Sequence, residues 1–138
     1  YSMSAQIRKE RAAYYDILEK TQRGPLDITP WMEWFLGCME RAINMAQTTL
    51  ESVLRKARFW QAYSGAALNE RQRRILNRLL DDFEGKLTTS KYAQIVKCSQ
   101  DTALRDIQDL VNKGILAKGE AGGRSTGYAL NFAGLSDN

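Results

Sequence analysis

The side chains that could carry out chemistry in this chain are limited first by the histidine count, which is zero. Without imidazole there is no Ser-His-Asp or Cys-His nucleophile pair, no histidine proton shuttle and no mixed Cys/His zinc site. Cys38 and Cys98 are too far apart in the sequence for a Cys-x-x-Cys motif, and we expect both to be reduced thiols. The carboxylates are dispersed, and the adjacent pair Asp81 and Asp82 has no second catalytic group beside it. We therefore expect no catalytic residues, no metal site and no cofactor in this chain.

A glycine-rich segment at residues 119–127 is the other feature that could hold a ligand. A phosphate-binding loop of the dinucleotide or P-loop kind needs a strand before it and a helix after it. Here the residues that follow, 128–132, have the pattern of a strand. The segment is therefore predicted to be the tip of a β-hairpin.

The remaining chemistry is hydrogen bonding to nucleic acid from a helix predicted over residues 99–113. Glutamine and arginine side chains can make bidentate contacts with adenine and guanine edges. The outer face of this helix offers four candidates for base contacts: Gln100, Thr102, Arg105 and Gln108. Four cations on the predicted turns and wing are candidates for phosphate contacts: Lys91, Lys97, Lys118 and Arg124.

Acidic residues on the same helix oppose this interpretation, because a carboxylate near phosphates is repelled unless it is paired within the protein. The helix carries Asp101, Asp106 and Asp109. Asp101 with Arg105 and Asp109 with Lys113 have the i,i+4 spacing at which opposite charges neutralise each other.

These candidates are positioned by a predicted winged helix in the second half of the chain. Asn69 is the N-cap candidate of its first helix, whose exposed side would carry Arg71, Arg73, Arg74 and Arg78. A short helix capped by Thr88, a turn at residues 97–98 and a helix capped by Ser99 give the helix-turn-helix pattern. The last helix ends at Gly114, and its apolar stripe is predicted to be Ala103, Leu104, Ile107, Leu110 and Val111. Residues 115–118 and 128–132 are predicted to pair as the two antiparallel strands of the wing.

The first half of the chain is predicted to contain helices only. One helix is predicted from an N-cap at Ser4 to about residue 22, and a second of roughly thirty residues begins where Thr29 precedes Pro30. Four aromatic residues of the second helix are expected to pack against the first: Trp31, Trp34, Phe35 and Trp60. Small residues at 63–67 mark the boundary between a helical segment, 1–64, and the winged helix, 68–138. The predicted fold class is mainly α, with a single small β-hairpin.

The composition, with 43% hydrophobic and 26% charged residues, is typical of a globular protein. No stretch approaches the ~20 apolar residues of a membrane-spanning helix, and no signal peptide is visible, so we expect a cytoplasmic chain without membrane contact. Lys and Arg number 20 against 16 Asp and Glu, a net charge of +4 that suits a nucleic-acid partner without requiring one. Because the chain opens at Tyr1 within a helical pattern, we expect it to be part of a longer protein.

Several segments resemble the region that follows the catalytic motif in bacterial Fic-family proteins, the protein adenylyltransferases. They are YSMS (1–4), YYD (14–16), LDITPWMEWFL (26–36), KARFW (56–60), LNERQR (68–73), GKLTTSK (85–91) and CSQDTALRDI (98–107). The resemblance covers most of the chain. It implies that residues 1–64 complete a helical Fic core to which the winged helix is appended.

Fic proteins transfer AMP from ATP to protein hydroxyl groups with an HPFxxGNGR motif, so the resemblance implies ATP and a divalent metal for a full-length parent. Because this chain has no histidine, no residue of that motif can be carried over to it. The activity would belong to a preceding portion, and that Fic core would be a partner of this chain.

Three functions are compatible with these observations. The winged helix could bind double-stranded DNA and regulate transcription, or it could be an interaction or oligomerisation module that controls a Fic core. The third, an enzyme in its own right, lacks convergent catalytic groups. Residues 69–138 hold 11 Lys and Arg against 9 Asp and Glu, a net charge of only +2, which is a weak electrostatic footprint for DNA. Salt dependence separates the first two, because a DNA binder loses affinity steeply as salt is added.

We predict that this chain alone does not transfer nucleotidyl groups, because it has neither the histidine base nor the phosphate-binding motif. Incubation with labelled ATP, a divalent metal and a protein acceptor should give no labelled product. Label that stays on the acceptor after repurification would contradict the prediction.

Overall fold

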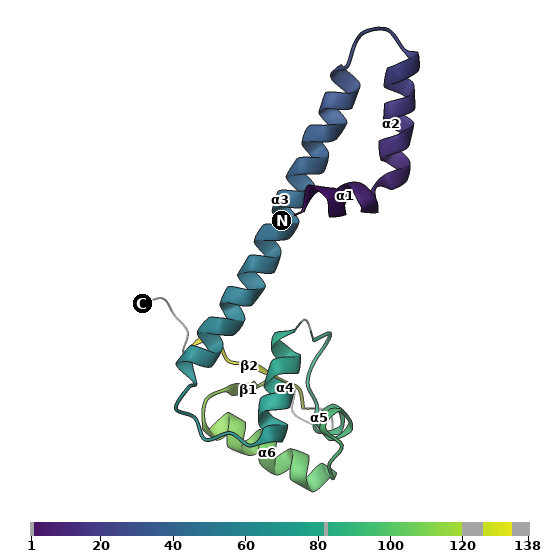
Figure 1. Cartoon of the computed structure of the whole chain (residues 1–138). Coiled ribbons are helices and arrows are strands. Elements are labelled where there is room, and N and C mark those ends of the chain that lie inside the picture. Colours follow the sequence, from purple (N-terminus) through teal and green to yellow (C-terminus); the bar gives the residue numbers. More distant parts are fainter. Residues whose placement is uncertain (1, 82, 120–125, 134–138) are drawn as a thin grey trace. The chain divides into compact units, whose positions relative to one another are not determined.

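A computed structural model describes residues 2–81, 83–119 and 126–133 of the chain (Figure 1). These residues form six α-helices and one two-stranded antiparallel sheet, so the fold is mainly α with a small β-hairpin, as predicted. The elements in order are α1 (Met3–Lys9), α2 (Arg11–Arg23), α3 (Thr29–Ala62), α4 (Glu70–Leu80), α5 (Thr89–Val96), α6 (Gln100–Asn112), β1 (Leu116–Lys118) and β2 (Tyr128–Leu130). The chain divides into two compact units, an N-terminal unit, Tyr1–Val53, and a C-terminal unit, Leu54–Asn138.

The first helix of the N-terminal unit is interrupted, so the prediction of one continuous helix capped by Ser4 is wrong. Ser2 caps α1 by accepting a hydrogen bond from the Ala5 amide, and the backbone leaves helical geometry at Glu10. The Glu10 carboxylate accepts hydrogen bonds from Arg41 Nε at 2.7 Å and from Gln6. These bonds hold the pKa of Glu10 below its usual range and fix the junction of α1 and α2 against α3.

Helix α3 is 34 residues long, close to the predicted length. The Asp27 side chain accepts a hydrogen bond from the Thr29 amide at 2.9 Å, so Asp27 supplies the cap expected of Thr29. Trp34 contacts the ring of Tyr14 in α2 as predicted. Trp60, expected on the first helix, packs instead against the core of the C-terminal unit and donates a hydrogen bond from Nε1 to Asn77 Oδ1 of α4 at 3.1 Å.

The core of the C-terminal unit therefore begins within α3, whereas the unit boundary from the sequence was placed at residues 64–68. Phe59 is fully buried together with side chains from every later helix and from β1. The largest of these are Ile75, Leu76, Leu87, Tyr92, Ile107, Leu110, Ile115 and Leu116.

The remaining elements follow the predicted local signals closely. Asn69 caps α4 in a capping box with Gln72, Thr88 caps α5 and Ser99 caps α6. Lys97, between α5 and α6, and Gly114, after α6, take left-handed backbone angles with φ of 55° and 71°. Strands β1 and β2 pair in antiparallel register, Leu116 opposite Leu130.

The described part of residues 1–64 contains no strand, as predicted. Within the described residues, no helix combines the length and apolar character needed to cross a bilayer.

We predict that Phe59→Ala lowers the free energy of unfolding of the C-terminal unit by about 3–5 kcal/mol, because it leaves a cavity in a fully buried site. Urea titration combined with hydrogen exchange at the Ile107 and Leu110 amides measures this unit specifically. The matched control is Leu50→Ala, at a position of α3 that is 58% exposed, which should shift stability by no more than about 0.5 kcal/mol. Equal losses in both variants would contradict the assignment of Phe59 to this core.

Candidate nucleic-acid interface

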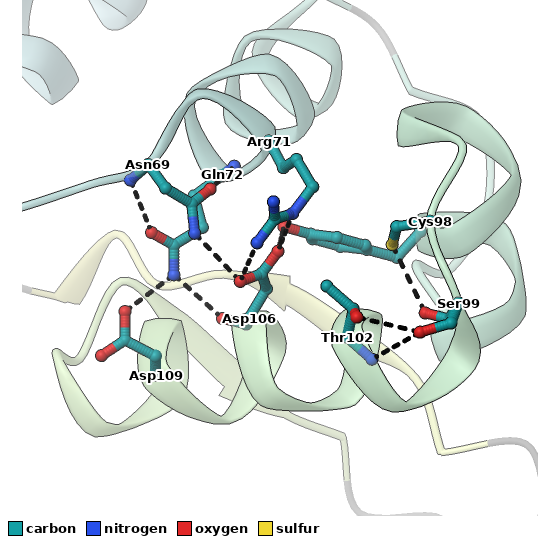
Figure 2. Close-up of polar contacts among 9 residues, drawn as sticks. Asn69, Arg71, Gln72, Cys98, Ser99, Thr102, Asp106 and Asp109 are labelled. Atoms are coloured by element: carbon teal, nitrogen blue, oxygen red, sulfur yellow. Dashed lines mark hydrogen bonds and ion pairs between the residues drawn. The ribbon is translucent and has the colours of Figure 1, made fainter.

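A buried carboxylate on α6 joins the three helices of the C-terminal unit (Figure 2). Asp106 is 6% exposed, and its Oδ2 accepts hydrogen bonds from Arg71 Nε at 2.7 Å and from the Tyr92 hydroxyl at 3.0 Å. Its Oδ1 accepts from Asn69 Nδ2 at 2.9 Å and from a second Arg71 nitrogen at 3.2 Å. Because Asn69 and Arg71 belong to the start of α4 and Tyr92 belongs to α5, this carboxylate fixes both helices to α6.

Gln72 adds a second connection between α4 and α6. Its side chain is 2% exposed, and Nε2 donates to the Asp106 carbonyl at 3.2 Å and to Asp109 Oδ2 at 2.7 Å. Its Oε1 accepts from the Asn69 amide at 2.9 Å. The capping box that starts α4 therefore also orients α6.

The electrostatics of this network keep Asp106 ionised. Burial alone would raise the pKa of Asp106, but hydrogen bonds from Arg71, Asn69 and Tyr92 outweigh burial and hold it below its usual range. Burial and the neighbouring Asp106 carboxylate raise the pKa of the Tyr92 hydroxyl, so it remains a hydrogen-bond donor. The Arg71 guanidinium, which the sequence placed on a solvated face, is the counter-charge of Asp106.

The network leaves an outer face on α6 that differs from the predicted one at Leu104. Leu104, expected in the apolar stripe, is 47% exposed on this face, while Asp106 points into the unit. Ala103, Ile107 and Leu110 are buried as predicted.

Three of the four candidate base-contacting residues lie exposed on the outer face: Gln100, Arg105 and Gln108. Gln100 also donates a hydrogen bond from Nε2 to Ser90 Oγ of α5 at 3.2 Å, a contact that the sequence analysis missed because it joins two helices. Thr102 lies at the side of the face, half-buried, with its hydroxyl 2.9 Å from that of Ser99.

Two of the three acidic residues of α6 are neutralised within the protein. Asp109 pairs with Lys113, as its spacing predicted, and Asp106 pairs with Arg71. The pKa of Asp109 is lowered by the hydrogen bond from Lys113 and by that from Gln72. Asp101 is exposed, and no ion pair joins it to Arg105 in the described part of the chain, which leaves the Arg105 guanidinium available.

The candidate phosphate contacts lie on separate elements. Lys91 is exposed on α5, with its ammonium 5.5 Å from the centroid of the Phe83 ring. Lys97 is exposed in the turn between α5 and α6, and Lys118 is exposed at the end of β1. Arg124 lies outside the described residues.

Part of the C-terminal unit is similar to a known protein family. Residues 71–126 match the DeoR-like helix-turn-helix domain. The matched range begins at the second residue of α4 and includes α5, α6 and β1, so this part of the C-terminal unit is similar to a helix-turn-helix domain. No curated protein matches the chain. The matched range does not reach residues 1–70, and it shows no relationship to Fic proteins.

We predict that Asp106→Asn lowers the stability of the C-terminal unit by about 1–3 kcal/mol at neutral pH, because it removes the charged acceptor that Arg71, Asn69 and Tyr92 share. The pKa of Asp106 is lower in the folded state, so its contribution is complete above the unfolded pKa near 4 and is lost as pH falls through the folded pKa. The difference between wild type and variant should therefore shrink as the pH is lowered below about 4.

Denaturant titrations at a series of pH values test this, with Asp101→Asn, an exposed change on the same helix, as the matched control. A difference for Asp106→Asn that does not change with pH would show that the carboxylate charge is not involved.

Proposed function

We propose that the C-terminal unit binds double-stranded DNA with α6 in the major groove, as a sequence-specific regulatory module. The observation that carries the proposal is the outer face of α6, where Gln100, Arg105 and Gln108 are exposed while Asp106 and Asp109 are paired within the protein. Glutamine suits adenine and arginine suits guanine in that groove. The match to a DeoR-like helix-turn-helix domain supports the same function.

Phosphate contacts would come from the elements on either side of this helix. Lys97 precedes α6, Lys91 lies on α5 and Lys118 lies on β1, so these cations can follow the DNA backbone beside the groove. Arg124, in the segment between the two strands, is proposed as a further backbone contact, and Thr102 as a contact at the edge of the base-reading face.

The small net charge of residues 69–138, 11 basic minus 9 acidic or +2, limits what one copy gains from phosphates. Many helix-turn-helix proteins bind as dimers to two half-sites about one helical turn apart. We therefore propose that two copies act together on DNA.

A second candidate function is protein interaction through the N-terminal unit, as the resemblance to Fic proteins suggests. Leu36, Ile43 and Leu50 of α3 are between 43% and 58% exposed, and a shallow groove between α1 and α3 is lined by Gln6, Met45 and other mostly apolar residues. Such a surface favours burial against another protein surface.

We propose as its partner a Fic core in the same parent chain, which would hold the ATP and divalent metal. Reading the coding sequence upstream of Tyr1 tests this: HPFxxGNGR there would support the proposal, and its absence would remove the Fic assignment.

The DNA-binding proposal predicts that the loss of a base contact and the loss of a phosphate contact change the binding affinity in different ways. On a duplex selected from a random pool, Arg105→Ala should lose ~1–3 kcal/mol of binding free energy and blur the sequence preference. Lys118→Ala should weaken binding to all sequences about equally and reduce the salt slope by roughly 1. Arg23→Ala, an exposed change in the N-terminal unit, is the control and should bind as wild type does.

The measurement is a titration of each variant at several salt concentrations. If no sequence is enriched and wild-type binding is no tighter than the ~0.1 mM to 1 μM of non-specific contacts, direct readout is wrong, and a role of the winged helix as an interaction or oligomerisation module should replace it.

A further inference from the structure

The outer face of α6 carries one apolar side chain among its polar ones. Leu104 is 47% exposed, and it is the only large apolar side chain exposed on the described residues of α4, α5 and α6. The helical repeat places Gln100 one turn before it and Gln108 one turn after it, and both are exposed. Arg105 is exposed next to Leu104. The three residues at positions 100, 104 and 108 therefore form a row of glutamine, leucine and glutamine along the face.

A single exposed leucine is ordinary on a protein surface, so its position within the face is what is informative. In the major groove the thymine C5-methyl is the apolar group that a base edge presents, and the partner adenine presents N7 and N6 to a glutamine amide. A leucine between two glutamines thus matches the major-groove edge of A·T base pairs.

We propose that Leu104 contacts the C5-methyl of a thymine and so selects an A·T pair near the centre of the DNA site, flanked by adenines read by Gln100 or Gln108. The proposal rests on the function proposed above, because it names what one residue of that interface recognises. The core-facing side of α6 is formed by Ala103, Ile107 and Leu110, which are buried, whereas Leu104 is half exposed.

The contact can be tested by removing one methyl group from the DNA. Deoxyuridine pairs as thymidine does but lacks the C5-methyl, so each thymine of the selected duplex is replaced by uracil in turn and the affinity is measured. We expect one replacement to weaken wild-type binding about fourfold, equivalent to ~0.8 kcal/mol for burial of one methyl-sized group. Leu104→Ala should bind the thymine duplex less tightly and should not distinguish thymine from uracil at that position.

Gln108→Ala is the matched control, because it shortens a neighbouring side chain on the same face and should retain the fourfold preference for thymine. Thermal unfolding of Leu104→Ala should show a folded protein with only a small loss of stability, since about half of the removed surface is exposed already.

The results separate this proposal from the one on which it rests. A selected duplex whose affinity is insensitive to every uracil replacement, or a preference that persists in Leu104→Ala, overturns the role of Leu104 while DNA binding stands. A selected site without an A·T pair in its central positions overturns it as well. Failure to enrich any sequence overturns both proposals.

Discussion

The buried carboxylate of Asp106 is the interaction on which the C-terminal unit depends. An ionised group with so little exposure is stable only if its acceptor positions are filled, because an unpaired buried charge is costly. Asn69, Arg71 and Tyr92 fill them, and these residues come from two helices other than its own. Filling the acceptor positions of Asp106 therefore constrains how the helices pack, because α4 and α5 must meet α6 where all three donors reach the carboxylate.

The same requirement shapes the exposed side of α6. Because Asp106 must point inward, the helix is rotated so that Arg105 and Leu104 point outward. Gln72, part of the capping box of α4, donates a hydrogen bond to Asp109 Oδ2, and Lys113 forms an ion pair with the same oxygen. The interactions that stabilise the unit thus also remove two negative charges from the face that would meet DNA.

Much of this fold could be predicted from local sequence signals. The features that the sequence did not predict depend on contacts between residues far apart in the chain. The caps Asn69, Thr88 and Ser99 act within three residues of themselves, so the sequence alone identifies them. Leu104 was placed on the wrong side because hydrophobic periodicity assigns leucine to the core, and no local signal indicates that Asp106 is buried. The three side chains that donate to the Asp106 carboxylate lie 37, 35 and 14 residues away in the sequence: Asn69, Arg71 and Tyr92. The break in the first helix at Glu10 was also missed, because Glu10 accepts a hydrogen bond from Arg41, 31 residues away. The place of Trp60 in the C-terminal unit was missed because its partner, Asn77, lies in another helix.

The balance of charged and uncharged groups on the outer face indicates how such a surface would discriminate. Its exposed row of Gln100, Leu104 and Gln108 has no net charge, and the opposite charges of the exposed Arg105 and Asp101, which form no ion pair in the described part of the chain, sum to zero. Charge attracts every DNA sequence alike, whereas amide hydrogen bonds and methyl contacts depend on the base presented. If α6 binds DNA as proposed, this face would gain little from phosphates, and its affinity would come from matching base edges and from two copies on adjacent half-sites. Such a module would be weak on random DNA, and its sequence preference would account for most of its binding free energy.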